Sequence, residues 1–462
     1  MITSPAFAGK RYVVLGLARS GAAAVATLLA SGAAVTAWDA REEPRNALAA
    51  KHGKALTFED PVTADLSGYD AIVVSPGVPL NRHPIAEVAA RAGVPLIGDI
   101  ELFALARPDL PAHRVVGITG TNGKSTTTAL VHHLLKSAAL PVRMGGNIGI
   151  PVLEQEPLAA GGVYVLELSS YQIDLMQSLA CEVAALLNIT PDHLDRYADF
   201  AAYAAAKARL LAMQKVGQHP GQHAVFGVGD AETSAIADTE SARRPAEFIH
   251  RVAGADLVAM QADWPSLQGP HNLQNAAVAV AIVEALGISP AQWRAAMPSF
   301  RGLPHRMERV AEAGGVLFIN DSKATNPASA APALGAFPPR ADLGGRKRIH
   351  WILGGLPKSD SLDECTPFFG NVAAAYIIGE AGPMFARLLE GQMQVYRAEM
   401  LSEAIRLAIV AARPGDVVML SPACASFDQF RDYEARGDAF RQLVEALLEQ
   451  SAESGNDTTG AQ

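Results

Sequence analysis

The fold is decided by one glycine-rich stretch, which reads Val116-Gly117-Ile118-Thr119-Gly120-Thr121-Asn122-Gly123-Lys124-Ser125-Thr126-Thr127-Thr128. It follows an apolar strand pattern, Arg114 to Ile118, and precedes a helical pattern through Leu130 and Leu135. A strand, a glycine turn, a Lys-Ser pair and a helix in this order are typical of a phosphate-binding loop. The stretch therefore predicts an ATP site.

Each residue type in this loop has a physical role. Gly120 and Gly123 let backbone N–H groups turn toward phosphate oxygens, and the helix start adds the positive end of its dipole. Lys124 neutralises phosphate charge, and the Ser125 hydroxyl can bind Mg²⁺. The common form of the motif has a glycine where this chain has Ile118, so the form found here is a narrower one. The alternative is an ordinary turn between a strand and a helix.

Length and composition predict a globular protein of several domains. A chain of 462 residues is too long for one core, and about 150 residues per domain suggests three. The boundaries we expect are 1–103, 104–302 and 303–450, followed by a polar, disordered tail, 451–462. A net charge of −9 without a dense Lys/Arg run argues against nucleic acid as a partner.

The cysteines and the apolar segments predict a cytoplasmic protein. Cys181, Cys365 and Cys424 are widely spaced, which argues against a disulfide framework or a Cys-x-x-Cys metal site. Arg19 interrupts the apolar N-terminal segment, which therefore does not read as a signal peptide. No uninterrupted apolar run reaches the roughly 20 residues that a membrane span needs, so membrane insertion is not expected.

The N-terminal third reads as a Rossmann-like parallel sheet. Strand patterns at 11–15 and 34–38 flank a turn, Gly16 to Gly21, and a helical pattern, and the second strand ends at Asp39. Further strand patterns cover 71–77 and 94–97. Dinucleotide sites use this layout, but Ala18 replaces the middle glycine and the signal for NAD is weak. Ligands of such sheets lie near the carboxyl ends of the strands, here Gly16 and Ser75 to Gly77.

Glu167 lies inside the otherwise apolar strand pattern Tyr164 to Leu168. An unpaired buried carboxylate costs several kcal/mol, and a Mg²⁺ near ATP phosphates is its natural partner. The alternative is a solvated position at the sheet edge.

His193 and Lys207 are the next candidates. His193 follows the strand pattern Ala184 to Ile189, at the edge where parallel sheets bind ligands, although a lone histidine is usually structural. Lys207 falls on the apolar stripe of a helical pattern that includes Tyr203 and Leu210. A buried lysine has a lowered pKa, and its neutral amine can add CO₂ to form a metal-binding carbamate. The alternative is that its stem packs while the ammonium reaches solvent.

Several other positions stay ambiguous from the residues alone. Asn147, in a glycine loop, either caps structure or faces a ligand, and the structural interpretation is favoured. Asn272 and Asn275 start an alanine-rich helical pattern and either cap it or bind an adenine edge. Residues 214–265 read as shorter strands and loops without assignable chemistry.

The C-terminal third predicts another α/β unit with a polar pocket. Strand patterns at 316–319, 349–353, 374–378 and 417–420 alternate with helical patterns. Asp321 and Lys323 follow the first strand, Lys358 follows the second and Ser426 the last. These side chains should meet at one sheet edge, as a cleft for an amino acid with two carboxylates requires.

In order along the chain, these motifs resemble those of the Mur ligases of peptidoglycan synthesis, through about Leu448. The resemblance is carried by Gly120–Thr126, Gly145–Gly149, Glu167–Ser170, Asp192–Arg196, Lys207, His271-Asn272 with Asn275, Gly302–Arg306, Asn320–Asn326, Gly354-Gly355 with Lys358, and Leu420–Phe430. The phosphate-loop and Asn/His motifs also resemble folylpolyglutamate synthase. The stretch Ser421 to Phe430 resembles the D-glutamate-adding branch of the Mur ligases.

The resemblance implies an α/β fold of three domains: a Rossmann-like domain for a UDP substrate, a P-loop ATPase domain with a mostly parallel sheet, and a Rossmann-like domain for the amino acid. It implies a monomeric ligase that uses ATP to join UDP-N-acetylmuramoyl-L-alanine to D-glutamate, with two Mg²⁺ ions.

The resemblance also implies a role for individual residues. The ATP side comprises Gly120, Thr121, Asn122, Gly123, Lys124, Ser125, Thr126, Asn272, Asn275, Arg306, Asp321 and Lys323. The UDP substrate contacts Leu17, Ala18, Arg19, Ser20, Asp39, Arg41, Gly77, Asn147 and His193. D-Glutamate contacts Thr325, Lys358, Ser426, Phe427 and Tyr433. The metal ligands are Ser125, Glu167, His193 and carbamylated Lys207, and the catalytic residues are Lys124, His193 and Lys207.

The implied reaction passes through an acyl phosphate, with closure of the C-terminal domain assembling the site. The chain departs from the family at Ala18-Arg19 and at Ala40, where a hydroxyl is common, so the details of UDP recognition stay open. The alternatives are a folate-type polyglutamate ligase and a non-ligase P-loop or NAD-binding regulator.

Overall fold

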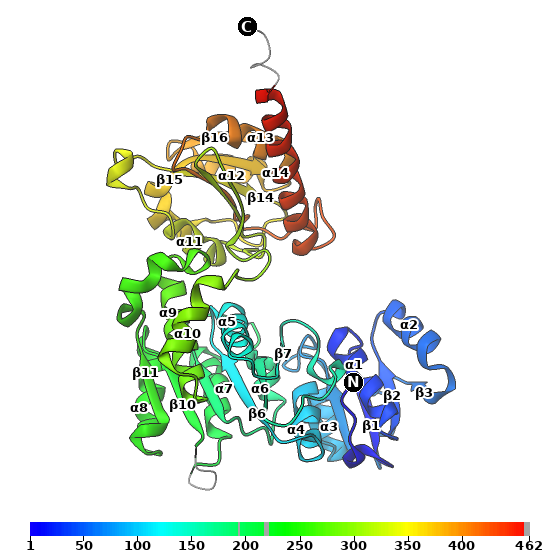
Figure 1. The fold of residues 1–462 in the computed structure, drawn as a ribbon. Coiled ribbons are helices and arrows are strands. Elements are labelled where there is room, and N and C mark those ends of the chain that lie inside the picture. The colour runs from blue at the N-terminus through cyan, green and yellow to red at the C-terminus, as the bar shows by residue number, and fades with distance from the viewer. Residues whose placement is uncertain (193–194, 217–220, 457–462) are drawn as a thin grey trace. The chain divides into compact units, whose positions relative to one another are not determined.

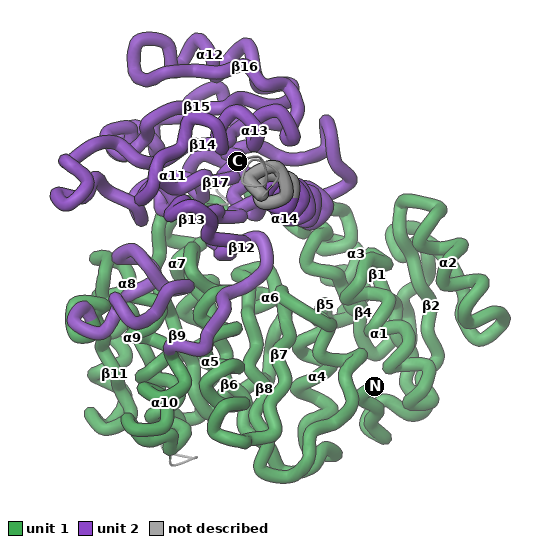
Figure 2. Tube along the Cα trace, turned by 45° about the horizontal axis from the view of Figure 1, so that its top comes forward, with its two compact units in different colours: residues 1–257, 274–297 green, residues 258–273, 298–462 purple. Residues whose placement is uncertain are grey.

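A computed structural model describes residues 1–192, 195–216 and 221–456 of the chain. The predicted site residue His193 lies outside the described residues, as does the end of the predicted tail, 457–462. The chain divides into two compact units, residues 1–257 with 274–297 and residues 258–273 with 298–462 (Figure 2).

The N-terminal sheet is parallel throughout and has the doubly wound strand order β3-β2-β1-β4-β5 (Figure 1). Its strands are β1 (Arg11–Leu15), β2 (Ala34–Trp38), β3 (Leu56–Phe58), β4 (Ala71–Val74) and β5 (Leu96–Ile97). Its helices are α1 (Arg19–Ala30), α2 (Glu42–His52), α3 (Ile85–Ala92) and α4 (Asp99–Ala106). The central strands are nearly continuous apolar runs because helices cover both faces of such a sheet. The predicted Rossmann-like arrangement is confirmed.

The second sheet of the same unit is also parallel, in the order β11-β10-β9-β6-β8-β7. Its strands are β6 (His113–Thr119), β7 (Val142–Gly146), β8 (Gly162–Glu167), β9 (Val183–Leu186), β10 (His223–Gly227) and β11 (Ile249–Val252). The helices that accompany it are α5 (Lys124–Ser137), α6 (Ser170–Asp174), α7 (Phe200–Ala212), α8 (Ala231–Ser241), α9 (Pro270–Ala285) and α10 (Pro290–Ala296). Strand β6 lies between β8 and β9, so the glycine loop leaves the middle of the sheet, with strand ends on both sides.

Helix α4 joins these two sheets into one unit. Its residues Ile100, Leu102 and Phe103 are fully buried in a hydrophobic cluster that contains side chains of both sheets. The ring of Phe103 lies 5.0 Å from that of Tyr164 on β8, edge to face. This shared apolar core explains why the residues around both sheets cluster as one compact unit.

The third sheet belongs to the other unit and has the order β12-β13-β17-β14-β15-β16. Its strands are β12 (Glu308–Ala313), β13 (Val316–Asn320), β14 (Ile349–Gly354), β15 (Val372–Ile378), β16 (Gln394–Glu399) and β17 (Val417–Leu420). Its helices are α11 (Pro327–Gly335), α12 (Gly382–Leu389), α13 (Leu401–Ala411) and α14 (Tyr433–Asn456). Only the β12–β13 pair of this sheet is antiparallel. Because β17 lies between β13 and β14, three loops that are distant in sequence leave adjacent strand ends.

Some boundaries differ from the sequence-based expectations. Residues 214–265, expected to hold only short strands and loops, contain the eleven-residue helix α8. Helix α14 continues through Asn456, beyond the predicted start of the disordered tail. Within the described ranges, no helix combines the length and the apolar character needed to cross a bilayer.

Candidate functional site

The phosphate loop is tightly packed between β6 and α5. The Lys124 Nζ donates to the carbonyl oxygens of Gly120 (2.9 Å) and Thr121 (2.7 Å) and so folds back over its own loop. Gly123 has a φ of +82°, and a Cβ there would lie 2.1 Å from the Oδ1 of Asn275. The residue before α5 is Gly123, which has no side chain to cap the helix. This cradle fits a phosphate group, which needs N–H donors and close backbone approach.

The residues just after β9 form hydrogen bonds with the phosphate loop. The Thr121 N–H donates to the carbonyl of Asn188 (2.9 Å), and the Asn122 N–H donates to the Asn188 Oδ1 (2.8 Å). Asn188 was not predicted as a site residue, because the sequence places it inside the strand pattern Ala184 to Ile189, whereas β9 ends at Leu186.

Glu167, at the end of β8, is only 3% exposed and faces the loop. Its carboxylate accepts hydrogen bonds from the Ser125 Oγ (2.5 Å) and the Asn147 Nδ2 (3.2 Å). The alternative of a solvated edge position is therefore wrong. A carboxylate and a hydroxyl oxygen that already meet are the donor set that Mg²⁺ prefers, so these residues fit the predicted metal.

Lys207, on α7, is 1% exposed and donates from Nζ to the carbonyl of Gly120 (2.9 Å). Its ammonium nitrogen also lies 4.5 Å from the centre of the Tyr203 ring. Burial, reinforced by the positive charge of Lys124, lowers the pKa of Lys207 to about 7. The prediction of an inward lysine is confirmed, and the exposed alternative is wrong.

The remaining predicted metal ligand, His193, is outside the described residues. Asp195 and Arg196, which follow it, contact the loop after β4. The Asn81 Nδ2 donates to the carbonyl of Asp195 (2.8 Å), and the Arg196 Nη2 donates to that of Val78 (3.1 Å). Across the parts of the chain that the structure describes, no three His, Cys, Asp or Glu side chains gather as a metal-binding group.

The predicted UDP residues surround the start of α1. Asp39 is buried and accepts from the N–H groups of Leu17 (2.8 Å) and Arg41 (3.0 Å). Burial by itself raises the pKa of Asp39, but these hydrogen bonds outweigh it, and the net effect is a lowered pKa. Leu17 itself is buried, with an exposure of 4%, and its N–H is already used in the hydrogen bond to Asp39.

The surrounding loops complete this end of the unit. The Arg19 guanidinium donates to the carbonyl of Gly149, next to the Asn147 loop, and the Ser75 Oγ donates to that of Gly16 (2.7 Å). Ala18, Arg19 and Gly77 are exposed. The predicted UDP residues Leu17 to Ser20, Asp39 and Arg41 thus lie at the carboxyl ends of β1 and β2, as expected.

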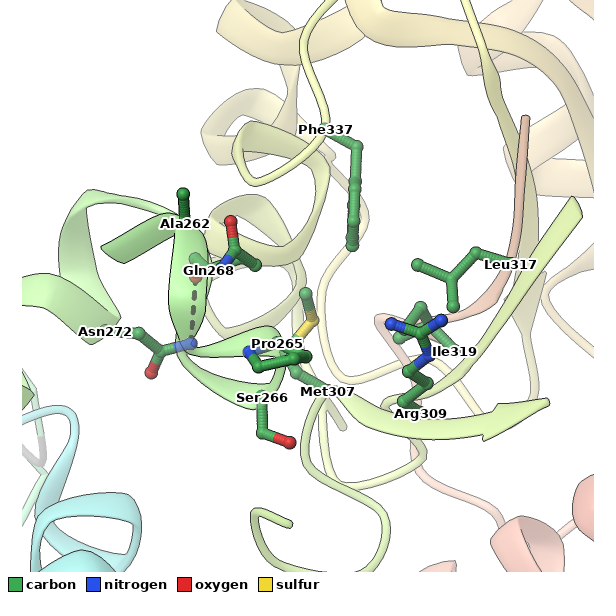
Figure 3. A pocket seen from close by; sticks show the side chains of 10 residues that line it. All are labelled: Ala262, Pro265, Ser266, Gln268, Asn272, Met307, Arg309, Leu317, Ile319 and Phe337. Carbon is green, nitrogen blue, oxygen red and sulfur yellow. Dashed lines mark hydrogen bonds between the residues drawn. The ribbon is translucent and has the colours of Figure 1, made fainter. Parts of the chain in front are cut away.

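The two asparagines predicted on the adenine side lie inside α9. The helix begins at Pro270, so Asn272 and Asn275 are within its first turns and are not its cap. Their side chains are 5% and 4% exposed, and the Asn272 Nδ2 donates to the carbonyl of Gln268 (3.0 Å) (Figure 3).

Asn272 also lines a cavity of about 210 Å³ in the second unit (Figure 3). The complete lining is Ala262, Pro265, Ser266, Gln268, Asn272, Met307, Arg309, Leu317, Ile319 and Phe337. One side combines Leu317, Ile319 and the Phe337 ring with the Arg309 guanidinium, whereas the other carries amide and hydroxyl groups. The sequence did not predict this cavity, because its walls come from segments that are distant in the chain.

In the second unit, Asp321 anchors the loop after β13. It is buried and accepts from the Ser421 Oγ (2.8 Å) and from the Met307 N–H (3.1 Å). Burial raises the pKa of Asp321 to about 7, against the opposing effect of these hydrogen bonds. His305 (φ +62°) and Met307 (φ +49°) have left-handed backbones, so the chain turns sharply on both sides of the predicted ATP-side residue Arg306.

The predicted D-glutamate residues lie on the loops after β13, β14 and β17 and at the start of α14. The Lys358 Nζ donates to the Thr325 Oγ1 (3.4 Å), and the Lys323 Nζ lies 3.9 Å from the centre of the Tyr433 ring. Ser426 is 2% exposed, whereas Phe427 is 68% exposed. The predicted meeting of these loops at one sheet edge is confirmed.

Three family models match successive parts of the chain. Residues 10–98 match the Mur ligase MurD-like N-terminal domain, residues 118–283 the Mur ligase middle domain, and residues 305–424 the Mur ligase glutamate ligase domain. Each matched range contains most of one of the three sheets.

Relatives and solved structures agree with these matches. UDP-N-acetylmuramoylalanine--D-glutamate ligase of Novosphingobium aromaticivorans is 68% identical over 97% of both chains, and that of Sphingopyxis alaskensis is 57% identical over 97% of this chain and 100% of its own. The crystal structure of UDP-N-acetylmuramate-alanine ligase MurC of Thermotoga maritima shares the fold at 17% identity, with a TM-score of 0.56 over 95% of this chain and 99% of its own. The chain belongs to the Mur ligase family.

Proposed function

We propose that this protein is the ligase that adds D-glutamate to UDP-N-acetylmuramoyl-L-alanine with consumption of ATP, in the synthesis of peptidoglycan precursors. The observation that carries the proposal is the 68% identity, over 97% of both chains, to a relative named for that reaction. The proposal assigns the UDP end to residues 1–103, ATP to 104–302 and D-glutamate to 303–450. The protein acts in the cytoplasm as a monomer.

The reaction begins with activation of a carboxylate, which is a poor electrophile at neutral pH. An oxygen of the L-alanine carboxylate attacks the γ-phosphorus of ATP, which releases ADP and leaves an acyl phosphate. Two anions meet in this step, so cationic side chains and oriented N–H groups determine its rate. Lys124 and the N–H groups of residues 120–126 neutralise the phosphates.

Mg²⁺ is the metal that fits the oxygen donors next to the loop. Ser125 and Glu167 would hold it at one site, and Glu167, carbamylated Lys207 and a ring nitrogen of His193 would hold it at a second. When bound, it neutralises phosphate charge. The buried contact between Ser125 and Glu167 orients both oxygens before any ligand arrives. Lys207 reaches the same glycine carbonyl as Lys124, which places its amine beside the phosphate loop.

The second step forms the amide bond. The unprotonated amine of D-glutamate attacks the acyl carbon, and the tetrahedral intermediate expels phosphate. Lys358 and Thr325 bind a carboxylate of D-glutamate, together with Ser426, Phe427 and Tyr433. Arg306, Asp321 and Lys323 serve the ATP side, as do Asn272 and Asn275.

The test is phosphate release from ATP with UDP-N-acetylmuramoyl-L-alanine and D-glutamate, each omitted in turn. We expect rapid release only when both are present, with one phosphate formed per amide bond. Lys124→Ala should lose activity by about 100-fold or more because the phosphate charge is no longer neutralised. Exposed Lys136→Ala, on the same helix, is the matched control and should keep it. Phosphate release that ignores both acceptor substrates would contradict the proposal and favour a regulatory P-loop ATPase.

A further inference from the structure

Arg436, in the first turns of α14, is one of the largest fully buried side chains of the protein, with an exposure of 1%. Burial lowers the pKa of Arg436 to about 10, so its desolvation is costly. A buried guanidinium persists only where its donors find well-placed acceptors.

The guanidinium uses four of its five N–H groups on two loops. Its Nε donates to the Ser322 Oγ (3.0 Å), and its Nη2 donates to the carbonyls of Ser322 (2.9 Å) and Cys424 (3.1 Å). Its Nη1 donates to the carbonyl of Ala425 (3.2 Å). These four acceptors are neutral oxygens, three of them backbone carbonyls, so the bonds fix the path of the chain.

The third neighbouring loop packs against the same group. Gly355 follows β14, and a Cβ there would lie 3.2 Å from the Arg436 Nη1 and 2.3 Å from the carbonyl of Ala425. Leu356 exchanges two backbone hydrogen bonds with Ala425, each 3.0 Å. Arg436 therefore lies under the ends of β13, β14 and β17 at once.

The next residue, Gly437, extends the same contact. Its carbonyl accepts from the Asn320 Nδ2 (3.0 Å), and a Cβ on it would lie 2.1 Å from the Nδ1 of His305. Ser322 also donates from Oγ to the carbonyl of Tyr433 (2.8 Å). The start of α14 is thus fastened to the segments just before Arg306 and Asp321.

We infer that Arg436 is a positioning residue for the amide-forming step: its guanidinium sets the spacing of the three loops that carry Thr325, Lys358 and Ser426. It touches no substrate itself. A misplacement of about 1 Å in such a site costs about 100-fold in rate. The relative positions of these loops therefore affect the rate of amide formation. The inference rests on the proposed function.

The decisive variant is Arg436→Lys, which keeps the charge but loses the planar set of donors. We expect kcat/KM for D-glutamate to fall by about 100-fold, with a rise in KM of about 10-fold. The dissociation constant for UDP-N-acetylmuramoyl-L-alanine, measured by calorimetry, should stay unchanged because its predicted site is in the other unit. KM for D-glutamate and the dissociation constant for the UDP substrate are both measured well below the melting temperature of the variant.

The matched control is Val444→Ala, also on α14 and fully buried, but in a cluster with the side chains of β13 and α13. It should lower the melting temperature without changing KM for D-glutamate. If the loss of activity in Arg436→Lys and in Val444→Ala simply follows the fall in melting temperature of each variant, the inference is overturned and the arginine is purely structural. A folded Arg436→Lys variant with wild-type kinetics would also overturn the inference.

Ser322→Ala gives an independent answer if Arg436→Lys does not fold. It removes one of the four acceptors, and we expect KM for D-glutamate to rise about 5-fold with UDP-substrate binding unchanged. An unchanged KM in Ser322→Ala would contradict the inference. If the wild-type protein itself shows no D-glutamate-dependent phosphate release, the proposed function fails, whatever these variants do.

Discussion

At the scale of single residues, burial changes the chemistry of two side chains. Lys207 and Asp321 are 1% and 7% exposed. The pKa of Lys207 is lowered to about 7, and the pKa of Asp321 is raised to about 7. Desolvation is the main cause for both, because it disfavours the charged form of either group. Perturbed pKa values of this kind are common at functional sites.

Lys207→Ala should reduce phosphate release by about 100-fold, since it removes the carbamate that we propose as a metal ligand. Formate or acetate at high concentration should partly restore activity by supplying a carboxylate in the vacated space. Exposed Lys215→Ala, just beyond α7, is the control and should behave as wild type. Failure of every small carboxylate to restore activity would count against the carbamate.

The carbamate should also depend on pH. CO₂ adds only to the neutral amine, and with a pKa of about 7 most of the Lys207 amine is neutral at pH 8 and little of it at pH 6. In ¹³C-bicarbonate, an NMR signal from the carbamate carbon should grow as the pH rises through 7 and be absent from Lys207→Ala. A signal of equal intensity at pH 6 and pH 8 would contradict this pKa.

Asp321→Asn should stabilise the protein in a pH-dependent way. The folded protein holds the Asp321 proton up to about pH 7, whereas the unfolded chain loses it near pH 4, so native stability falls as the pH rises between these values. The asparagine side chain cannot titrate, so the variant avoids this loss. The amount by which its free energy of unfolding exceeds that of the wild type should be about 2 kcal/mol larger at pH 8 than at pH 5.

Melting temperatures at the two pH values measure this difference, and exposed Asp360→Asn is the control. A gain that is the same at both pH values would mean that Asp321 does not titrate in this range.

At the scale of elements, the strand-loop-helix unit β6-α5 was predictable because each of its parts has a local signal. The apolar strand, the glycines and the amphipathic helix all lie within one segment. The residues that contact this loop were harder to predict. Asn188, Glu167 and Asn275 come from three other segments. Of these, Asn188 was not predicted, because a polar residue inside an apolar strand pattern is not marked as a site residue by its position.

Gly123→Ala should abolish ATP-dependent turnover, with a loss of about 100-fold or more. A Cβ there would lie 2.1 Å from the Asn275 Oδ1, and the φ of +82° strains any residue other than glycine. The loop would then have to move away from α9. Turnover with saturating substrates is the measurement.

Gly229→Ala is the matched control, because a Cβ at Gly229 meets nothing within 4 Å and its backbone is not left-handed. We expect wild-type turnover from this variant. Wild-type turnover from Gly123→Ala as well would show that the loop does not need its close contact with α9.

At the scale of the whole molecule, the predicted substrate residues divide between the two units. The UDP set and the phosphate loop belong to the first, and the D-glutamate set belongs to the second. Each set depends on its own sheet, since parallel strands gather loop residues at their carboxyl ends. The effects of substitutions on the two substrates should therefore be separable.

Lys358→Ala should raise KM for D-glutamate by about 10-fold or more, because a carboxylate loses its cation. The dissociation constant for UDP-N-acetylmuramoyl-L-alanine should be unchanged in calorimetry. Lys347→Ala, an exposed lysine of the same unit, is the control. A parallel loss of affinity for both substrates would contradict this division of labour.

The sequence by itself determined the α/β class, the phosphate loop and the order of the motifs, because those signals are local and rest on periodicity, glycine and strand-end residues. It also placed Lys207 on an apolar stripe, but it left open whether the ammonium is buried or reaches solvent. Only the tertiary structure decided that Glu167 is buried against Ser125, that Arg436 hydrogen-bonds to the loops after β13 and β17, and that a cavity lies beside Asn272. These facts depend on contacts between distant segments, which no local pattern encodes.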